Sequence, residues 1–197
     1  MVPIPQYPLY SASIALYGGQ LVPYYLDEEG GWALDLANMR SSLREARARG
    51  TCVRALVFIN PGNPSGACLT AANVQELIEF CYENKLVLIA DEVYQENIYN
   101  PNLPFIGARR VLHSMPEPVR SSVELVSLHT VSKGGWGECG LRGGYMEVSA
   151  CVSAFFVCLC VPYVLCVTIL LTIPCPCPCP CPRRACEATQ LRPIGGR

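Results

Sequence analysis

The stretch Val123-Glu-Leu-Val-Ser-Leu128-His-Thr-Val-Ser-Lys133 decides the fold of this chain. Its mainly apolar first half predicts a buried strand, and the following turn, rich in serine, threonine and glycine, holds Lys133. Lys85 is the one other lysine in the sequence. An amine among small residues can be desolvated and lose its proton, and a flat molecule can approach the backbone there. The stretch is therefore typical of a Schiff-base lysine, although a surface lysine in a glycine-rich turn is the commoner case.

Two further apolar runs, residues 53–59 and 86–90, have the composition of strands buried on both faces. They alternate with helical patterns at residues 34–49 and after Thr70, which is expected to cap a helix with Val74, Leu77, Ile78 and Cys81 on one side. Alternating strands and helices predict βαβ units and an α/β fold with a mostly parallel sheet. Shorter elements are expected as helices at 8–17 and 108–114, and as strands at 2–5 (edge or terminal), 20–26 and 141–148.

Composition divides the 197-residue chain into two parts. Its 15 Lys and Arg balance 16 Asp and Glu, which gives no electrostatic reason to expect a nucleic-acid partner. Cysteines are scattered through the first part and crowded in the last, so residues 1–148 have the character of a cytosolic α/β segment with free thiols. Residues 149–197 form an apolar, Cys/Pro-rich tail of another kind.

Polar clusters follow the three central strands at their carboxyl ends: residues 60–66, 91–94 and 132–142. In a parallel sheet these ends meet at one edge, where ligands bind. Each residue alone has a commoner role: Asn63 in a turn, Asp91 as a helix cap, Tyr94 in the core and Arg142 in a surface ion pair. Their convergence predicts a binding site around Lys133.

The motifs Pro5-Gln-Tyr-Pro-Leu-Tyr10, Asn60-Pro-Gly-Asn-Pro-Ser-Gly66, Ala90-Asp-Glu-Val-Tyr94 and Ser132-Lys133, with Arg142, resemble class I aminotransferases of the pyridoxal-phosphate fold type I. The segment Gly137-Glu-Cys-Gly140 is similar to that of the alanine aminotransferases within this family. The resemblance covers residues 1–148. It implies the central portion of a large, cofactor-binding domain with a partial three-layer fold.

The resemblance also implies a role for each site residue. Lys133 is expected to be the catalytic residue, covalently linked to pyridoxal 5′-phosphate and acting as general base and acid. Asp91 is expected to hold a proton on the pyridine nitrogen, and Tyr94 and Asn63 to bond the ring's phenolic oxygen. Four more residues are expected to bind the cofactor: Tyr7 by stacking on the ring, and Arg142, Ser132 and Thr130 by contacting the phosphate. No metal site is expected.

Two departures from the family pattern accompany the resemblance. Relatives usually have an aromatic residue two positions after the lysine, where this chain has Gly135. Relatives also have long segments before Pro3 and after residue 148, so the chain is expected to be truncated at both ends, with reduced or no activity. The implied reaction is transamination between L-alanine and 2-oxoglutarate, with glutamate:glyoxylate transamination as the alternative. A homodimer and a cytoplasmic location are expected, with an organellar one left open.

The tail leaves three interpretations open. No charged residue occurs from Val148 to Ile173, and this run is longer than the about 20 residues that span a bilayer. The first interpretation is therefore a membrane anchor in a non-catalytic product. The Cys-Pro repeat of residues 174–182 offers thiolates to a metal, but it lacks the spacing that wraps zinc. The favoured interpretation is an out-of-family extension from read-through or alternative splicing.

Overall fold

The computed structural model describes residues 1–149 of the chain. Seven strands and five helices alternate along this part, with one 3₁₀ turn at Cys139–Leu141. The strands are β1 (Val2–Ile4), β2 (Pro23–Asp27), β3 (Ala33–Leu34), β4 (Ala55–Ile59), β5 (Val87–Asp91), β6 (Leu125–Thr130) and β7 (Gly144–Ser149). The helices are α1 (Leu9–Leu16), α2 (Leu36–Ala48), α3 (Ala71–Asn84), α4 (Ala108–Ser114) and α5 (Val119–Ser122).

The main sheet has the order β4-β5-β6-β7. Its first three strands are parallel, and β7 runs antiparallel to β6. A smaller sheet joins β1 to β2 in parallel and β2 to β3 antiparallel. The sequence predicted the strand at 2–5 to be an edge or terminal strand. The order β1-β2-β3 places β1 at the end of this sheet, as predicted, and the Val57 N–H of β4 donates to the carbonyl of Met1, just before β1, at 2.9 Å.

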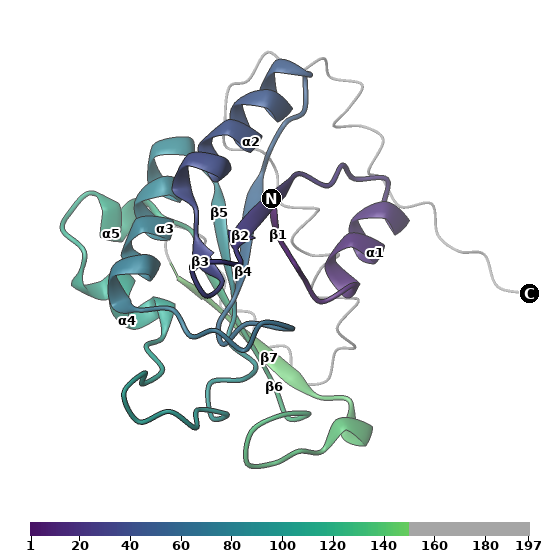
Figure 1. Cartoon of the computed structure of the whole chain (residues 1–197), viewed down its shortest axis with the longest axis vertical. Helices are drawn as coiled ribbons and strands as arrows, with labels where there is room; N and C mark the ends of the chain where they lie inside the picture. Colours follow the sequence, from purple (N-terminus) through teal and green to yellow (C-terminus); the bar gives the residue numbers. More distant parts are fainter. Residues whose placement is uncertain (150–197) are drawn as a thin grey trace, which may run out of the picture.

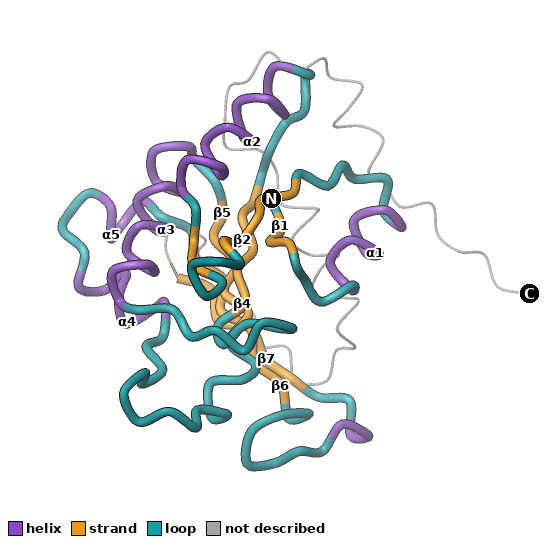
Figure 2. Tube along the Cα trace, viewed as in Figure 1, coloured by secondary structure: helices purple, strands orange, loops and turns teal. Residues whose placement is uncertain are grey.

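Helices cover the two faces of the sheets unequally (Figures 1 and 2). The larger core lies under α2, α3 and α4, and its fully buried side chains include Met39, Leu77 and Leu88. The smaller core lies on the opposite face, where Tyr10 of α1 packs with residues such as Ile89 and Leu128. The described part is thus a three-layer α/β arrangement, which confirms the predicted fold class.

Local signals in the sequence explain where the long helices begin and end. Thr70 Oγ1 accepts the Asn73 N–H at 3.2 Å, and the Asn73 side chain accepts the Thr70 N–H, which forms a capping box at the start of α3. Asp35 caps α2 by accepting the Asn38 N–H at 3.0 Å. Gly50, with φ +82°, follows the end of α2 in the left-handed conformation that glycine adopts without strain.

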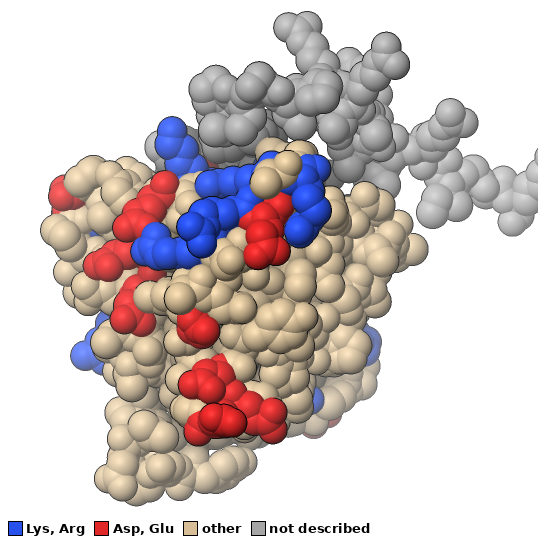
Figure 3. All heavy atoms as spheres, turned by 45° about the horizontal axis from the view of Figure 1, so that its top comes forward, with Lys and Arg blue, Asp and Glu red and all other residues tan. Residues whose placement is uncertain are grey.

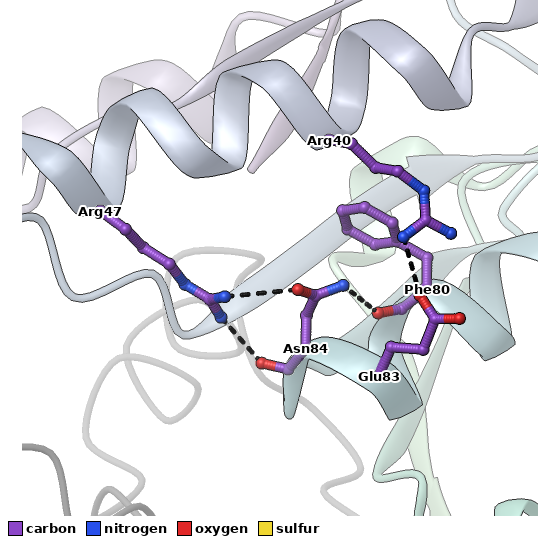
Figure 4. Close-up of polar contacts among 5 residues, drawn as sticks. All are labelled: Arg40, Arg47, Phe80, Glu83 and Asn84. Atoms are coloured by element: carbon purple, nitrogen blue, oxygen red, sulfur yellow. Dashed lines mark hydrogen bonds and ion pairs between the residues drawn. The ribbon is translucent and has the colours of Figure 1, made fainter.

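The arginine row of α2 has partners on α3. The sequence favoured a solvated face for Arg40, Arg44, Arg47 and Arg49, and Figure 3 shows basic side chains gathered along one edge of the surface. Figure 4 shows that two of them reach across to the end of α3. Arg40 pairs with Glu83 at 2.8 Å and lies over the Phe80 ring, and Arg47 donates to the Asn84 carbonyl at 2.9 Å. These arginines hold two helices together.

The remaining differences from the sequence prediction are short elements. The strand β3 and the helix α5 were not predicted, because two and four residues carry too little periodicity to recognise. No helix within residues 1–149 is long and apolar enough to span a bilayer. The interpretations offered for the tail, residues 149–197, concern residues that lie almost entirely outside the described part.

Candidate active site

The carboxyl ends of β4, β5 and β6 lie level at one edge of the main sheet. Asp91 is in register with Ile59 on one side and with Leu128 on the other. Main-chain bonds extend this alignment into the loops, since the Asn60 N–H donates to the Asp91 carbonyl at 2.9 Å. The loops after the three strands therefore emerge at the same end of the sheet, as Figure 1 shows. The predicted convergence of the three polar clusters is present in the fold.

Asp91 is a buried carboxylate that accepts hydrogen bonds on both of its oxygens. Its exposed fraction is 2%, and the hydroxyl of Tyr10 donates to its Oδ2 at 2.6 Å. The Val93 N–H donates to Oδ1 at 3.4 Å. Hydrogen bonds to a carboxylate oxygen fix its direction. Asp91 is therefore held, by a tyrosine on α1, at the end of the strand on the face covered by that helix.

Tyr10 is the residue that the sequence analysis missed. It belongs to the first quoted motif, but it was given no role, because its contact with Asp91 joins positions 81 apart in the chain. The available signal was its place in that motif, three residues after Tyr7; Tyr7 precedes α1, and Tyr10 lies in its first turn. Burial would have been harder to foresee, since Tyr10 is 3% exposed and Tyr7 is 41% exposed.

Three side chains from three different loops meet around the Tyr94 ring. The Nζ of Lys133 lies 5.3 Å from the ring centroid, a distance at which an ammonium is attracted to an aromatic face. The amide Nδ2 of Asn63 lies 3.5 Å from the Tyr94 hydroxyl oxygen. An amine, a phenol and a carboxamide are thus within reach of one small molecule, with the Asp91 carboxylate three residues before Tyr94.

The predicted phosphate-binding residues do not form one group: Thr130 and Ser132 lie together, and Arg142 bonds elsewhere. Thr130 is buried, and its hydroxyl lies 3.1 Å from the Ser132 oxygen and 3.0 Å from the Gly143 carbonyl. Arg142 is exposed and adopts φ +53°, and its guanidinium donates to the Cys139 carbonyl at 2.5 Å. Within residues 1–149, no hydrogen bond joins Arg142 to Ser132 or Thr130. The two hydroxyls are together and the guanidinium faces its own loop.

Two further features of the described part are Tyr7, a predicted cofactor-binding residue, and a cavity beside Asn63. Within residues 1–149, no hydrogen bond or ring contact joins the Tyr7 side chain to Asp91, Tyr94 or Lys133. The cavity beside Asn63 is lined mostly by apolar residues, including Pro3, Leu26 and Trp32, and it shares only Asn63 with the predicted site. Without a carboxylate or amine in its lining, this cavity cannot perform the predicted chemistry.

Glu92 places a second carboxyl next to Asp91 in the sequence but in another environment. Its Oε1 accepts the Ala108 N–H at 2.7 Å, at the start of α4. Burial raises the pKa of the Glu92 carboxyl, and the hydrogen bond from Ala108 opposes this shift. Adjacent strand-end residues point to opposite sides. Asp91 therefore faces α1 and Glu92 faces α4, and Asp91 is the carboxylate on the side of Tyr10.

The donor set suits the pyridine half of pyridoxal phosphate. Lys133 offers the amine that a cofactor aldehyde requires, Asp91 offers a carboxylate for a ring nitrogen, and Tyr94 offers a phenol for a ring oxygen. All three lie at or just after the carboxyl ends of two neighbouring parallel strands, where this fold class binds its ligands. The residues described here therefore fit the cofactor's ring.

Known proteins match the chain along most of its length. The family model "Aminotransferase class I and II" matches residues 1–167, which extends beyond the predicted boundary at 148. Glutamate--glyoxylate aminotransferase 1 of Arabidopsis thaliana is 60% identical over 149 residues, which are 76% of this chain and 31% of that protein. Alanine aminotransferase 2, mitochondrial, of the same plant is 55% identical over 151 residues, which are 77% of this chain and 28% of that protein.

Solved structures give the same result. The alanine aminotransferase from Pyrococcus furiosus superposes with a TM-score of 0.63 at 28% identity, covering 76% of this chain and 34% of that one. The chain spans about a third of the length of the curated relatives that it matches. The matched family generally depends on pyridoxal phosphate and uses amino and keto acids as substrates, and its members are generally dimeric. From its sequence and its fold, the chain belongs to the class I and II aminotransferases.

Proposed function

We propose that this chain binds pyridoxal 5′-phosphate through Lys133 and serves in transamination between L-alanine and 2-oxoglutarate. The observation that carries the proposal is the position of the Lys133 amine, 5.3 Å from the centre of the Tyr94 ring, at the edge where three parallel strands end. Relatives named for alanine as substrate share 51–55% identity with the chain, as the plant and mouse enzymes show.

Each residue has a defined task in this proposal. When bound, the cofactor supplies an electron sink for the negative charge that develops at the substrate Cα. Lys133 provides the nucleophilic amine and later takes the proton from Cα as a general base. Asp91 holds a proton at the ring nitrogen, and Tyr10 keeps its carboxylate in place. Tyr94 and Asn63 donate hydrogen bonds to the ring's phenolic oxygen.

The second candidate is glutamate:glyoxylate transamination. It is favoured by the 60% and 57% identity to two Arabidopsis glutamate--glyoxylate aminotransferases, which is similar to the identity with the alanine enzymes. Both reactions need the same amine and the same carboxylate, so the residues of the cofactor site do not distinguish them. The two candidates differ in the amino donor and in the keto acid, which a substrate test separates.

The cellular location and the oligomeric state of the protein are also proposals. We infer a cytoplasmic location, supported by the four free thiols in the described part: Cys52, Cys68, Cys81 and Cys139. A homodimer is proposed because members of the family are generally dimeric. For Arg142, Ser132, Thr130 and Tyr7, the proposed contacts are with the phosphate and the ring face, as the family resemblance implies.

Reductive trapping tests the cofactor assignment. The full chain is mixed with pyridoxal phosphate, reduced with borohydride and mapped by peptide mass spectrometry. The expected result is a cofactor label on Lys133 well above that on Lys85, which is exposed at the end of α3 and serves as an internal reference. In Lys133→Ala the visible absorbance of the complex and the label should be lost, whereas Lys85→Ala should keep both. Equal labelling of the two lysines contradicts the proposal.

A half-reaction assay then separates the two candidates. The loaded chain is mixed with L-alanine or with L-glutamate, and the change in cofactor absorbance is followed before 2-oxoglutarate or glyoxylate is added. Recovery of the starting spectrum with 2-oxoglutarate after alanine supports the first candidate. Recovery with glyoxylate after glutamate, and no change with alanine, supports the second.

A further inference from the structure

Two side chains from the loop after β5 hold the main chain on the far side of Lys133. The carboxylate of Glu96 accepts the Gly135 N–H at 2.6 Å. The side-chain oxygen of Asn97 accepts the Gly134 N–H at 3.2 Å. These are the two amides that directly follow Lys133. The first is a short, charge-assisted bond, which is the stronger kind.

The same turn carries the aromatic partner of the lysine. Tyr94 lies two residues before Glu96, and its carbonyl accepts the Asn97 N–H at 2.8 Å, so residues 94–97 form one hydrogen-bonded turn. Lys133 is thus tied to this turn at two levels. Its side chain lies over the Tyr94 ring, and the backbone after it bonds to Glu96 and Asn97.

The other bonds around the lysine stay within its own loop, residues 131–142, and the residues that flank it. The Gly137 N–H donates to the Lys133 carbonyl at 3.4 Å, and the Glu138 N–H donates to the Val131 carbonyl at 2.9 Å. Such bonds shape the loop but do not place it. Within the described part of the chain, the hydrogen bonds that link this loop to the loop after β5 are those of Glu96 and Asn97.

Glycine is required for the close approach of Glu96. Gly134 has φ +64°, and a Cβ at this position would lie 2.4 Å from the Glu96 Oε2. A Cβ at Gly135 would lie 3.4 Å from the same oxygen. The small residues after the lysine therefore make room for a carboxylate beside the backbone, in addition to any room they give a ligand.

From this geometry we propose that Glu96 is a positioning residue for Lys133, which fixes the lysine's main chain to the turn that carries Tyr94. Asn97 assists through the neighbouring amide. The inference deepens the proposed function and rests on it for the role of Lys133. Glu96 is exposed and accepts backbone N–H groups, so it acts through the loop and takes no part in the chemistry.

The first experiment needs no cofactor. Amide hydrogen exchange is measured on the full chain and on Glu96→Ala, with Glu79→Ala as the matched control. Glu79 is an exposed glutamate on α3 whose carboxylate bonds the Gln75 side chain. The Gly135 amide should exchange about three- to tenfold faster in Glu96→Ala, the range expected of one exposed charge-assisted bond. Unchanged exchange in Glu96→Ala overturns the proposal.

The second experiment tests whether Glu96 positions the Lys133 amine for reaction with the cofactor. Each variant is reduced with borohydride in the presence of pyridoxal phosphate, and the ratio of label on Lys133 to label on Lys85 is measured across a pH series. The ratio should fall about three- to tenfold in Glu96→Ala and stay at the wild-type value in Glu79→Ala. Glu96→Gln should rescue most of it, because the amide oxygen can still accept the Gly135 N–H.

The outcomes separate this inference from the proposed function. A wild-type chain that labels Lys133 no better than Lys85 refutes the proposed function, while the exchange experiment still decides whether Glu96 anchors the loop. A wild-type chain that labels Lys133 selectively, with an unchanged ratio in Glu96→Ala, refutes the positioning role alone. Faster exchange, a lower ratio in Glu96→Ala and rescue by Glu96→Gln together support it.

Discussion

The carboxylate and the amine of the proposed site are held in opposite ways. Asp91 is buried at the end of a strand, in register with both neighbours, and a buried tyrosine donates to it at 2.6 Å. Lys133 lies in a loop of mostly exposed residues, held by side-chain contacts from one neighbouring turn. The fold itself fixes the carboxylate, whereas a few separate bonds fix the amine. Mutations should therefore affect stability at the first position and labelling at the second.

Tyr10→Phe should have the largest effect on stability. It removes the phenolic donor from the buried Asp91 carboxylate, and a hydrogen bond to a charged group contributes about 1.5–3 kcal/mol. Urea unfolding of the full chain measures the loss, and Tyr25→Phe, at an exposed tyrosine of β2, is the control with no expected change. A loss in Tyr10→Phe no larger than that in Tyr25→Phe would show that the sheet alone holds the carboxylate.

Gly134→Ala should cost less, about 1–2 kcal/mol, because a residue with a Cβ is strained at φ +64°. Two neighbouring glycines serve as controls in the same unfolding assay. Gly137 has φ +58° with open space around it, so Gly137→Ala reports the backbone strain without the Glu96 contact. Gly140 has neither a positive φ nor a close neighbour, so Gly140→Ala should be neutral. A neutral Gly134→Ala would mean that the loop readily adopts another conformation.

Glu92→Gln should change how the free energy of unfolding depends on pH more than it changes the free energy of unfolding at any one pH. Burial raises the pKa of this carboxyl above its usual 4.5, so the folded state holds the proton more tightly than the unfolded state. The contribution of the group is fully present below 4.5 and is lost as pH rises through the raised pKa. Urea unfolding at a series of pH values should show this decline in the wild-type chain and a flatter profile in Glu92→Gln. Parallel profiles would contradict the assignment.

Lys133→Ala should have the smallest effect on stability, within about 0.5 kcal/mol, as expected for a partly exposed loop side chain. It should nevertheless abolish selective cofactor labelling. The same urea titration gives the first quantity and borohydride trapping gives the second. A loss of stability comparable to that of Tyr10→Phe would erase the distinction between the two halves of the site.

The sequence predicted those parts of the fold that depend on local patterns. Apolar runs located β4, β5 and β6, and the Thr70 cap located the start of α3, because these signals come from residues close together in the chain. The level ends of three parallel strands then followed from topology, and Lys133 and Asn63, which follow two of them, both contact Tyr94.

What the sequence could not predict depends on contacts between distant segments. The bond from Tyr10 to Asp91 requires α1 to lie across the opposite face of the sheet, and no local pattern fixes that position. The bond between Met1 and β4 and the contacts of Arg40 and Arg47 with α3 have the same origin. Glu96 and Asn97 were overlooked for another reason: a single acceptor side chain in a loop looks like any other surface residue.

The register of β5 also restricts where insertions and deletions can be tolerated in this family. Asp91 and Glu92 are consecutive carboxylates that face α1 and α4 respectively. A one-residue change of length in Val87–Asp91 would turn the following side chains to the other face: a deletion would present Glu92 to Tyr10 in place of Asp91, and an insertion would present Ala90. The loop at residues 97–107 can change length without this exchange. Length variation among natural homologues should therefore gather in that loop and be absent from β5.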